Sequence, residues 1–461
     1  MPEEGRPLQQ QPRCGEIHIM PGNEESVETK LQRIAEKARS DPKCRFTSLF
    51  HLMNRELLRG CFWRLKDHRA SGIDRVTKEQ YAVNLMENLD DLIGRLHRMA
   101  YIPQPVRRVY IPKPGSDKKR PLGIPALEDK LVQAALSKIL QAIYEQDFID
   151  DSYGFRPDRS CHDALRALGQ TIERQGIQVI VEADIKGFFD NVDQDRLMEF
   201  LAHRIVDKRV LRYIKRFLKA GIQEDGTYRA SDRGTPQGGV ISPLLANIYL
   251  HYVLDIWFQR RFLKTCTGTA RLIRYADDYV VCFKQEADAQ RFRVEMEQRL
   301  SQFGLEIAPE KTRILEFGSL AQRRAKERGE RKAEAFDFLG FTHYCTTTRK
   351  GKRFRVGRKT ISKRMSAKLK CFKQWLQKNR TLPTAEIMRT TARKLRGHYA
   401  YYGVSGNSKS ISNFAYEVRM ILFKWLNRRG KCGCMSYEKF DLLKMRFPLP
   451  APRIMVNLWS L

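Results

Sequence analysis

Two apolar arms around an acidic pair, in residues 272–283, constrain the fold more than any other part of the sequence. This segment reads Leu-Ile-Arg-Tyr-Ala-Asp-Asp-Tyr-Val-Val-Cys-Phe. Arms rich in Val, Ile and aromatic residues are typical of strands, and a polar centre between two such arms is typical of a tight turn. The segment therefore predicts a β-hairpin that presents the carboxylates of Asp277 and Asp278 at its turn.

A third acidic residue, Asp184, follows another apolar run. Residues 178–182 read Gln-Val-Ile-Val-Glu, which predicts a short buried strand. Each aspartate taken alone is more simply a turn former or a helix cap. Strand ends in one sheet can converge, however, and three converging carboxylates repel one another and do not all ionise. A pair of Mg²⁺ ions resolves this repulsion with oxygen ligands and promotes an in-line phosphoryl displacement.

The net charge favours this functional interpretation. The sequence has 85 Lys and Arg against 53 Asp and Glu, a formal net charge of +32, which indicates a polyanionic partner such as nucleic acid. The excess is concentrated in residues 346–461, where 28 basic residues minus 4 acidic residues give +24. An ordinary solvated helix face mixes both signs, so this region is expected to contact the polyanion.

Periodicity divides the chain into an α+β part and a helical part. Residues 1–25 are expected to form a loose tail, residues 319–335 an exposed charged insertion, and the chain after residue 345 only helices, around 360–378, 384–402 and 410–429. Further expected helices cover 27–39, 47–65, 78–99, 127–148, 196–220, 242–262 and 286–303. Residues 106–111 and 120–125 predict a basic β-hairpin, and residues 336–341 a strand. Ser242 and Pro243 are expected to cap and begin their helix.

Six motifs in a fixed order carry a resemblance to a known family. They are Ser-Tyr-Gly-Phe-Arg-Pro at 152–157, Asp-Ile-Lys-Gly-Phe-Phe-Asp-Asn-Val at 184–192, Gly-Thr-Pro-Gln-Gly-Gly at the start of 234–247, Tyr-Ala-Asp-Asp at 275–278, Pro-Glu-Lys-Thr at 309–312 and Phe-Leu-Gly-Phe at 338–341. Over roughly residues 45–420 the chain resembles the group II intron-encoded reverse transcriptase/maturases. The resemblance implies a right-hand polymerase fold, with a tail and helical extension in 1–65, fingers and palm of mixed sheet and helices in 66–345, and an all-helical basic thumb or maturase domain in 346–461.

The resemblance also implies roles for single residues at the reacting centre. Asp184, Asp277 and Asp278 match the catalytic and metal-binding carboxylates, with Asp277 the firmer ligand of the hairpin pair, and Ile185 completes the metal-binding positions. The implied cofactor is two Mg²⁺ ions.

The positions that match nucleotide-binding residues of the family are Lys113, Arg120, Arg107, Phe189 and Gln237. The basic hairpin supplies cations for a triphosphate, although these cations could simply coat a loop. Phe189 matches the aromatic residue that stacks under the sugar and excludes a 2′-hydroxyl. Its alternative is a core position, because Phe188 is adjacent and one of the two rings must point elsewhere.

The positions that match template, primer or RNA contacts are Lys311, Phe338, Gly340, Arg396, His398 and Tyr399. Residues 395–403 interleave Arg, His and Tyr, which neutralise phosphates and stack on unpaired bases. The three tyrosines of this segment could instead be ordinary helix packing. His398 is either an RNA contact or a packed histidine.

Other features bound the function. No apolar run approaches the ~18 residues of a membrane span, and the acidic first 25 residues argue against a signal peptide, so a cytoplasmic, bacterial protein is expected. The chain lacks the paired cysteines and His-Asn-His pattern of the endonuclease domain that many family members carry. Cys432 and Cys434 alone are a weak metal pattern and are better explained as two half-buried thiols.

The resulting expectation is an RNA-directed DNA polymerase that adds dNTPs to a primer 3′-hydroxyl on an RNA template with two Mg²⁺ ions. Its expected partners are an intron RNA, the template RNA, the primer or target DNA and dNTPs, and its expected further roles are splicing assistance and retrohoming. Two alternatives stay open: an RNA-binding splicing cofactor with incidental polymerase activity, and a domesticated relative in repair or defence.

Overall fold

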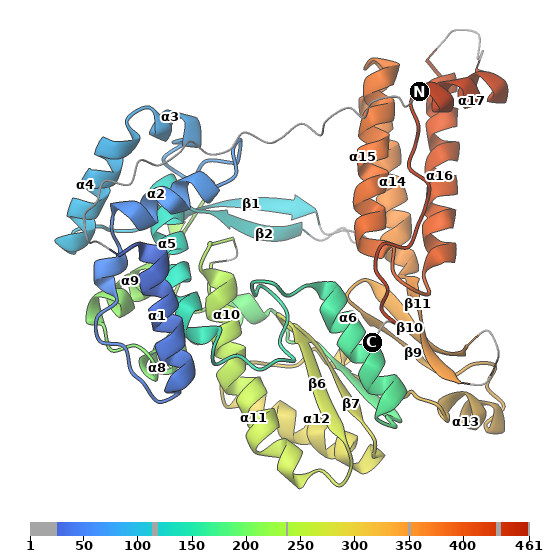
Figure 1. Cartoon of the computed structure of the whole chain (residues 1–461), viewed down its shortest axis with the longest axis horizontal. Helices are drawn as coiled ribbons and strands as arrows, with labels where there is room; N and C mark the ends of the chain where they lie inside the picture. Colours follow the sequence, from blue (N-terminus) through green and yellow to red (C-terminus); the bar gives the residue numbers. More distant parts are fainter. Residues whose placement is uncertain are drawn as a thin grey trace, which may run out of the picture.

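The computed structural model describes residues 25–112, 119–236, 238–348, 351, 353–429 and 435–459. Figure 1 shows helices on one side, a central sheet, and an upright group of helices at the C-terminal side. The strands are β1 (Val106–Pro112), β2 (Lys119–Ile124), β3 (Val179–Ala183), β4 (Ile222–Glu224), β5 (Thr227–Arg229), β6 (Ala270–Tyr275), β7 (Asp278–Phe283), β8 (Arg313–Glu316), β9 (Ala335–Phe338), β10 (Phe341–Thr347) and β11 (Phe354–Thr360).

The helices lie between and after these strands. The long and medium helices are α1 (Val27–Ser40), α2 (Arg55–Arg64), α4 (Leu85–His97), α5 (Leu127–Tyr144), α6 (Cys161–Arg174), α8 (Gln194–Ala202), α9 (Lys208–Leu218), α10 (Ser242–Leu250), α12 (Glu286–Ser301), α14 (Ser362–Lys378), α15 (Thr384–Tyr402), α16 (Ser408–Asn427) and α17 (Tyr437–Arg446). The short ones are η1 (Phe50–Leu52), α3 (Lys78–Ala82), α7 (Phe188–Asn191), η2 (His251–Asp255), α11 (Ile256–Arg260), η3 (Phe262–Thr265), η4 (Pro309–Lys311) and α13 (Ala321–Glu327). None of the helices in the described part of the chain is long and apolar enough to cross a bilayer.

The central sheet has the strand order β6-β7-β3-β8 and is buried on both faces. All its neighbouring pairs are antiparallel. Side chains alternate between the faces of a strand, so Val179 and Val181 of β3 join a core with α5, α10 and α12. Ile180, between them, joins a second core with α6, β9–β11 and α14–α16. The predicted hairpin and the predicted strand before Asp184 are therefore neighbours in one sheet.

A second sheet, in the order β2-β1-β4-β5, holds the predicted basic hairpin. β1 and β2 pair antiparallel, and β4 adds to β1 in parallel. In the view of Figure 1 this hairpin extends from the side of α2–α5 toward the C-terminal helices.

Several expected boundaries are wrong. The chain after residue 345 is not only helical, because β10 continues to Thr347 and β11 pairs with it along its length. The segment 196–220 forms two helices, since Asp207 interrupts it and caps α9 by accepting hydrogen bonds from Arg209 N and Val210 N. Likewise 78–99 divides into α3 and α4, and 242–262 contains the π-helical turn η2 between α10 and α11.

Two expected helix starts are also corrected. The helix predicted from residue 47 begins at Arg55 with Asn54 as its cap, whose side chain accepts from Leu57 N at 3.0 Å. Ser242 is already helical and donates to the Pro236 carbonyl instead of capping α10. Part of the charged insertion folds as α13, with Ala321 and Ala325 buried. The tail before residue 25 lies outside the described residues.

A fully buried ion pair fixes the position of the central hairpin. Arg274 of β6 and Asp255 of η2 are both inaccessible to solvent and form two bonds, Nε to Oδ1 at 2.8 Å and Nη2 to Oδ2 at 2.5 Å. Arg274 Nη1 also donates to Asn247 Oδ1 at 2.9 Å and to the carbonyl of Ala276 at 3.0 Å. One guanidinium therefore ties the helix beneath the sheet to the turn of the hairpin.

We predict that Asp255→Asn destabilises the fold by about 3–5 kcal/mol, because it leaves the Arg274 charge buried without a counterion. Chemical denaturation of wild type and variant measures this difference. Glu199→Gln is the matched control, since it breaks the exposed Arg196–Glu199 pair and should cost less than about 1 kcal/mol. Equal effects of the two substitutions would contradict the prediction.

Candidate active site

Three aspartates meet at one end of the central sheet. Asp184 directly follows β3, and Asp278 is the first residue of β7. The two strands are antiparallel neighbours, and Ala183 of β3 pairs with Tyr279 of β7. Asp184 and Asp278 are therefore each one residue beyond this pair, at the same end of the sheet. Asp277 occupies the turn between β6 and β7. The negative charge of Asp184 acts on both hairpin carboxyls. The convergence predicted from the apolar runs is present in the fold.

The hairpin turn has an unusual backbone that its neighbours enforce. Ala276 adopts a left-handed conformation with φ of 58°, which a non-glycine residue rarely adopts. The backbone of Gly154 packs against this turn so closely that a Cβ on Gly154 would lie 2.3 Å from Ala276 N. Asn247 Nδ2 donates to the Gly154 carbonyl at 2.6 Å. Through these contacts the motif at 152–157 supports the acidic turn.

The surroundings raise the pKa of both hairpin carboxyls. Loss of water contact raises the pKa of Asp277, and the charge of Asp184 raises it further, while Arg120 lowers it. Asp278 is solvent-accessible, yet protein on most sides removes enough water to raise its pKa to about 6, with added repulsion from Asp277 and Asp184. Arg364 and Lys311 act in the opposite direction on Asp278. The site thus holds more negative charge than the protein itself neutralises.

Lys311, expected to contact template or primer, lies beside the carboxylate of Asp184. Its Nζ donates a short hydrogen bond to Asp184 Oδ2, and this bond raises the pKa of Lys311. The Asp184 backbone carbonyl accepts from Ala308 N at 2.8 Å, so η4 is held against the end of β3. The motif at 309–312 therefore contributes a cation to the site.

The carboxylates have the chemistry of ligands for a divalent cation, although in this structure their side chains are not arranged as a complete set of metal ligands. No group of three or more His, Cys, Asp or Glu side chains in the described part of the chain is arranged to hold a metal ion. Asp277 and Asp278, however, are adjacent hard oxygen donors whose pKa values are raised. Such an uncompensated pair favours a cation with oxygen ligands.

The glycine-rich segment 234–247 joins this site to the basic hairpin. Thr235 N donates to the Phe189 carbonyl at 2.8 Å. A Cβ on Gly238, whose φ is 111°, would lie 2.2 Å from the Gly123 carbonyl of β2. Phe188 is buried in the core, whereas the neighbouring Phe189 is half-buried, so Phe189 is the ring that remains available to a ligand.

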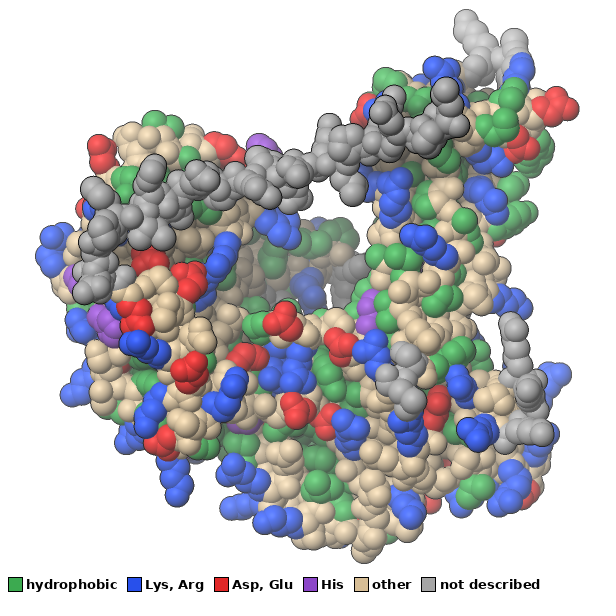
Figure 2. Space-filling view, in the orientation of Figure 1, with side chains coloured by type: hydrophobic (Ala, Val, Ile, Leu, Met, Phe, Trp, Pro, Cys, Tyr) green, Lys and Arg blue, Asp and Glu red, His purple; other side chains and the backbone are tan. Residues whose placement is uncertain are grey.

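The cations of the basic hairpin differ in their partners. Arg120 is exposed and its charge reaches Asp277. Arg107 is half-buried and its guanidinium donates to the carbonyls of Ser71 at 2.7 Å and Gly72 at 3.2 Å, which gives it a structural role. Figure 2 shows a hollow between this side of the molecule and the C-terminal helices, with Lys and Arg side chains around it.

Known proteins are similar to this chain in sequence. The reverse transcriptase (RNA-dependent DNA polymerase) family matches residues 111–343, half of the chain. The chain belongs to the reverse transcriptase family. The group II intron-encoded protein LtrA of Lactococcus lactis subsp. cremoris is 29% identical over 477 aligned positions, covering 88% of this chain and 78% of LtrA. Protein YkfC of Escherichia coli (strain K12) is 36% identical over 290 positions, covering 56% of this chain and 76% of YkfC.

The motifs predicted a group II intron-encoded reverse transcriptase/maturase, and these similarities confirm that prediction. An uncharacterized 91 kDa protein in the cob intron of Schizosaccharomyces pombe is also 35% identical over 236 positions, covering 50% of this chain and 28% of that protein. The matched region of this chain has the palm and fingers fold of the family, and enzymes of this family generally act with divalent metal ions.

The predicted RNA-contact residues of the C-terminal region divide into accessible and buried ones. Arg396 is exposed, but His398 and Tyr399 are each 3% exposed, and this burial contradicts their expected RNA contact. The His398 ring lies 3.7 Å from that of Phe414, and burial lowers its pKa to about 3. Tyr399 donates to the Pro450 carbonyl at 3.3 Å. The packing alternative is the correct one for both.

The turn between β9 and β10 approaches the site from the C-terminal side. Phe338 is buried, and Gly340 has φ of 86°, with Arg364 Nη1 3.2 Å from the position of a Cβ. The charge of Arg364 acts on Asp278, but the sequence did not predict this residue. Residues 349–373 contain many basic residues, and no sequence motif distinguishes Arg364 from the others. Lys113, Gln237, Cys432 and Cys434 lie outside the described residues.

We predict that Asp278→Asn raises the thermal unfolding temperature at pH 7.5 in buffer with EDTA. The folded-state pKa of about 6 lies above the ordinary value of 3.8. The contribution of the Asp278 carboxyl to the free energy of unfolding is therefore fully present below pH 3.8, where the group is protonated in both the folded and the unfolded chain. It is lost as the pH rises through 6 and the folded protein must ionise the group. Scanning calorimetry of wild type and variant measures the difference, which should shrink as the pH falls below 6.

The control for this prediction is Asp195→Asn, since the Asp195 side chain is 85% exposed and its carboxylate lies 3.9 Å from Lys215 Nζ, a long and solvated ion pair. It should leave the unfolding temperature unchanged. A lower unfolding temperature for Asp278→Asn would show that the three carboxylates do not repel one another in the folded state.

Proposed function

We propose that this protein is an RNA-directed DNA polymerase that adds dNTPs to the 3′-hydroxyl of a primer on an RNA template. The single observation that carries this proposal is the convergence of Asp184, Asp277 and Asp278 at the end of a buried antiparallel sheet. A protein that only binds RNA has no need for the adjacent carboxyls of Asp277 and Asp278, whose pKa values are raised by loss of water contact and, to a smaller degree, by neighbouring negative charge.

Two Mg²⁺ ions are the proposed cofactor. The carboxylates of Asp184, Asp277 and Asp278 would hold them, together with the backbone carbonyl of Ile185, whose side chain is buried and anchors the end of β3. When bound, such ions activate an attacking hydroxyl and stabilise a leaving phosphate oxygen. Lys311 orients the Asp184 carboxylate by its hydrogen bond.

The remaining groups of the site are proposed to bind the nucleotide. Arg120, with Lys113 and Gln237 as further candidates, would contact the triphosphate and the incoming base from the fingers. Phe189 would lie beneath the sugar, since it is the less buried of the two adjacent rings. Gly340 and Arg364 approach from the other side, where the primer strand is expected.

The chain divides, in this proposal, into an N-terminal extension (1–65), fingers and palm (66–345) and a basic thumb or maturase region (346–461). The last region would bind an intron RNA and assist its splicing and retrohoming. The names of the relatives support this extension, since they include the intron-encoded protein LtrA and a nuclear intron maturase of Arabidopsis thaliana that is 32% identical over 95 positions.

A second candidate function is splicing assistance with incidental DNA synthesis, which the intron-encoded relatives also favour. Intron self-splicing at low Mg²⁺, measured with the wild type and with a polymerase-deficient variant, separates the two activities. Splicing that persists without DNA synthesis would assign the second function to the RNA-binding surfaces alone.

We predict that Asp277→Asn abolishes extension of a DNA primer on an RNA template, because it removes a charged oxygen ligand from the proposed metal site. RNA affinity should stay within about twofold, since no phosphate contact is lost, and it should fall steeply with salt in both proteins. Gel-based primer extension and filter binding measure the two quantities. Asp195→Asn is the control, and extension by Asp277→Asn at the wild-type rate would refute the metal assignment.

We also predict that Phe189→Val allows incorporation of ribonucleotides. Removing the ring opens space beside the sugar, and a pocket change of this size alters discrimination by roughly 10- to 200-fold. Single-nucleotide extension with dCTP and with CTP gives the ratio of kcat/KM values. Phe189→Tyr keeps the ring and should retain the wild-type ratio, whereas an unchanged ratio in Phe189→Val would remove this residue from sugar selection.

A further inference from the structure

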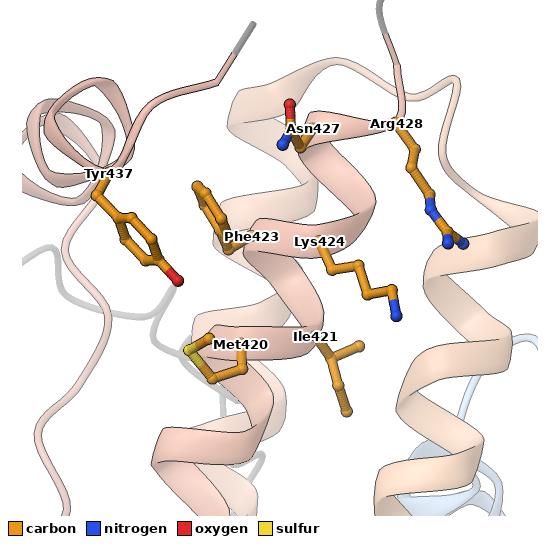
Figure 3. Close-up of a pocket in the computed structure, with 7 residues that line it drawn as sticks. All are labelled: Met420, Ile421, Phe423, Lys424, Asn427, Arg428 and Tyr437. Atoms are coloured by element: carbon orange, nitrogen blue, oxygen red, sulfur yellow. The ribbon is translucent and has the colours of Figure 1, made fainter. Parts of the chain in front are cut away.

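The C-terminal helices carry a groove that the proposed polymerase chemistry does not use. It has a volume of about 700 Å³ and follows α16 beside the start of α17, within the ~300–1,000 Å³ of typical ligand sites. Figure 3 shows Met420 and Phe423 directed toward Tyr437 on one side, and Lys424 and Arg428 extending on the other. The groove thus has an aromatic side and a cationic side.

The groove is distant from the carboxylates. α16 is tied to β11 at its first turn, where Asn407 Oδ1 accepts from Thr360 N at 2.9 Å. From Ser408 to Phe423 the helix rises roughly 20 Å, at ~1.5 Å per residue. A ligand in this groove would therefore contact the protein away from the site that holds the reacting groups.

Tyr437 forms a fixed aromatic surface. Its ring stacks on Phe423 with centroids 4.3 Å apart and an interplanar angle of 15°. Phe423 is in turn held by the buried Phe440, 5.3 Å away. Tyr437 nevertheless remains 58% exposed. One ring face is packed and the other is open, which is the arrangement on which proteins stack unpaired nucleic-acid bases.

The charge of the groove selects the class of partner. Lys424 and Arg428 are exposed, and the described residues that line the groove include no Asp or Glu. The Arg428 guanidinium stands over the Trp425 ring, 5.3 Å from its centroid, which holds it at the rim. An apolar peptide would leave both cations without counterions, whereas a nucleic-acid strand supplies a phosphate for each.

We propose that this groove binds unpaired nucleotides of a single-stranded RNA segment, with one base stacked on Tyr437 and the flanking phosphates on Lys424 and Arg428. The inference rests on the proposed RNA binding and adds to it a contact outside the cleft for primer and template. Unpaired RNA fits better than a duplex, because the bases of A-form RNA are not open to an aromatic face.

The test measures the affinity of a single-stranded RNA of about twelve nucleotides for the full chain, whose cleft is first filled with a blunt primer–template duplex. Tyr437→Ala and Tyr437→Leu should each weaken binding roughly 5- to 150-fold, and Tyr437→Phe should bind like wild type. The Lys424→Ala/Arg428→Ala double variant should lower the slope of log affinity against log salt by about 1.4. An RNA with one 4-thiouridine should crosslink to Tyr437 or Phe423.

Equal affinities of Tyr437→Leu and Tyr437→Phe would overturn the inference, as would crosslinks confined to other regions or an equal loss of binding to a blunt RNA duplex. Sedimentation showing that Tyr437→Leu dissociates a dimer would assign the groove to a second copy and also overturn it. Primer extension by the same preparations keeps the two proposals apart. Primer extension that persists in Tyr437→Leu would leave the proposed polymerase function standing whatever happens to RNA binding in the groove. A crosslink in the groove of a protein that extends no primer would support RNA binding there and contradict the proposed polymerase function.

Discussion

The buried pair of Arg274 and Asp255 is the interaction on which the geometry of the candidate site depends. A buried ion pair gives little net stability compared with apolar packing, but breaking it is costly, so it acts mainly as a positional constraint. Because the same guanidinium also donates to the Ala276 carbonyl, the strained turn is fixed to η2 beneath the sheet. Asn247 then ties this network to Gly154, so the turn that carries the carboxylates is held in one orientation relative to the central sheet.

Around this fixed turn the protein gathers opposite charges from separate elements. Arg120 comes from β2, Lys311 from η4 and Arg364 from α14, and each lowers the pKa of one of the hairpin carboxyls. None of these cations cancels the repulsion that the carboxylates retain. The site is therefore less stable than a neutral arrangement would be, which is typical of sites shaped for ligands and not for folding. It also means that the basic hairpin, the central sheet and the C-terminal helices all contribute charge to one site.

The sequence predicted those parts of the fold whose cause is local. The β-branched arms of 272–283 and the run before Asp184 form strands because their side chains alternate into two cores. Whether His398 and Tyr399 are buried depends instead on which elements pack against α15. The residue type of a histidine or tyrosine in a basic segment does not reveal this packing. Asp207 illustrates the same limit: its carboxylate also accepts from Leu49 N and Phe50 N at 2.8 Å, a tertiary contact that no periodicity reveals.

The net charge of the C-terminal region also overstates how many of its basic residues can contact RNA, because tertiary packing buries some of them. Arg358 counts among the basic residues of the C-terminal region, yet it is fully buried and donates to the Leu165 carbonyl at 3.1 Å. A cation buried in this way releases no counterions when RNA binds, because it is out of reach of phosphate. The salt dependence of binding should therefore report the exposed subset, of which Lys424 and Arg428 are members, and not the full excess of +24.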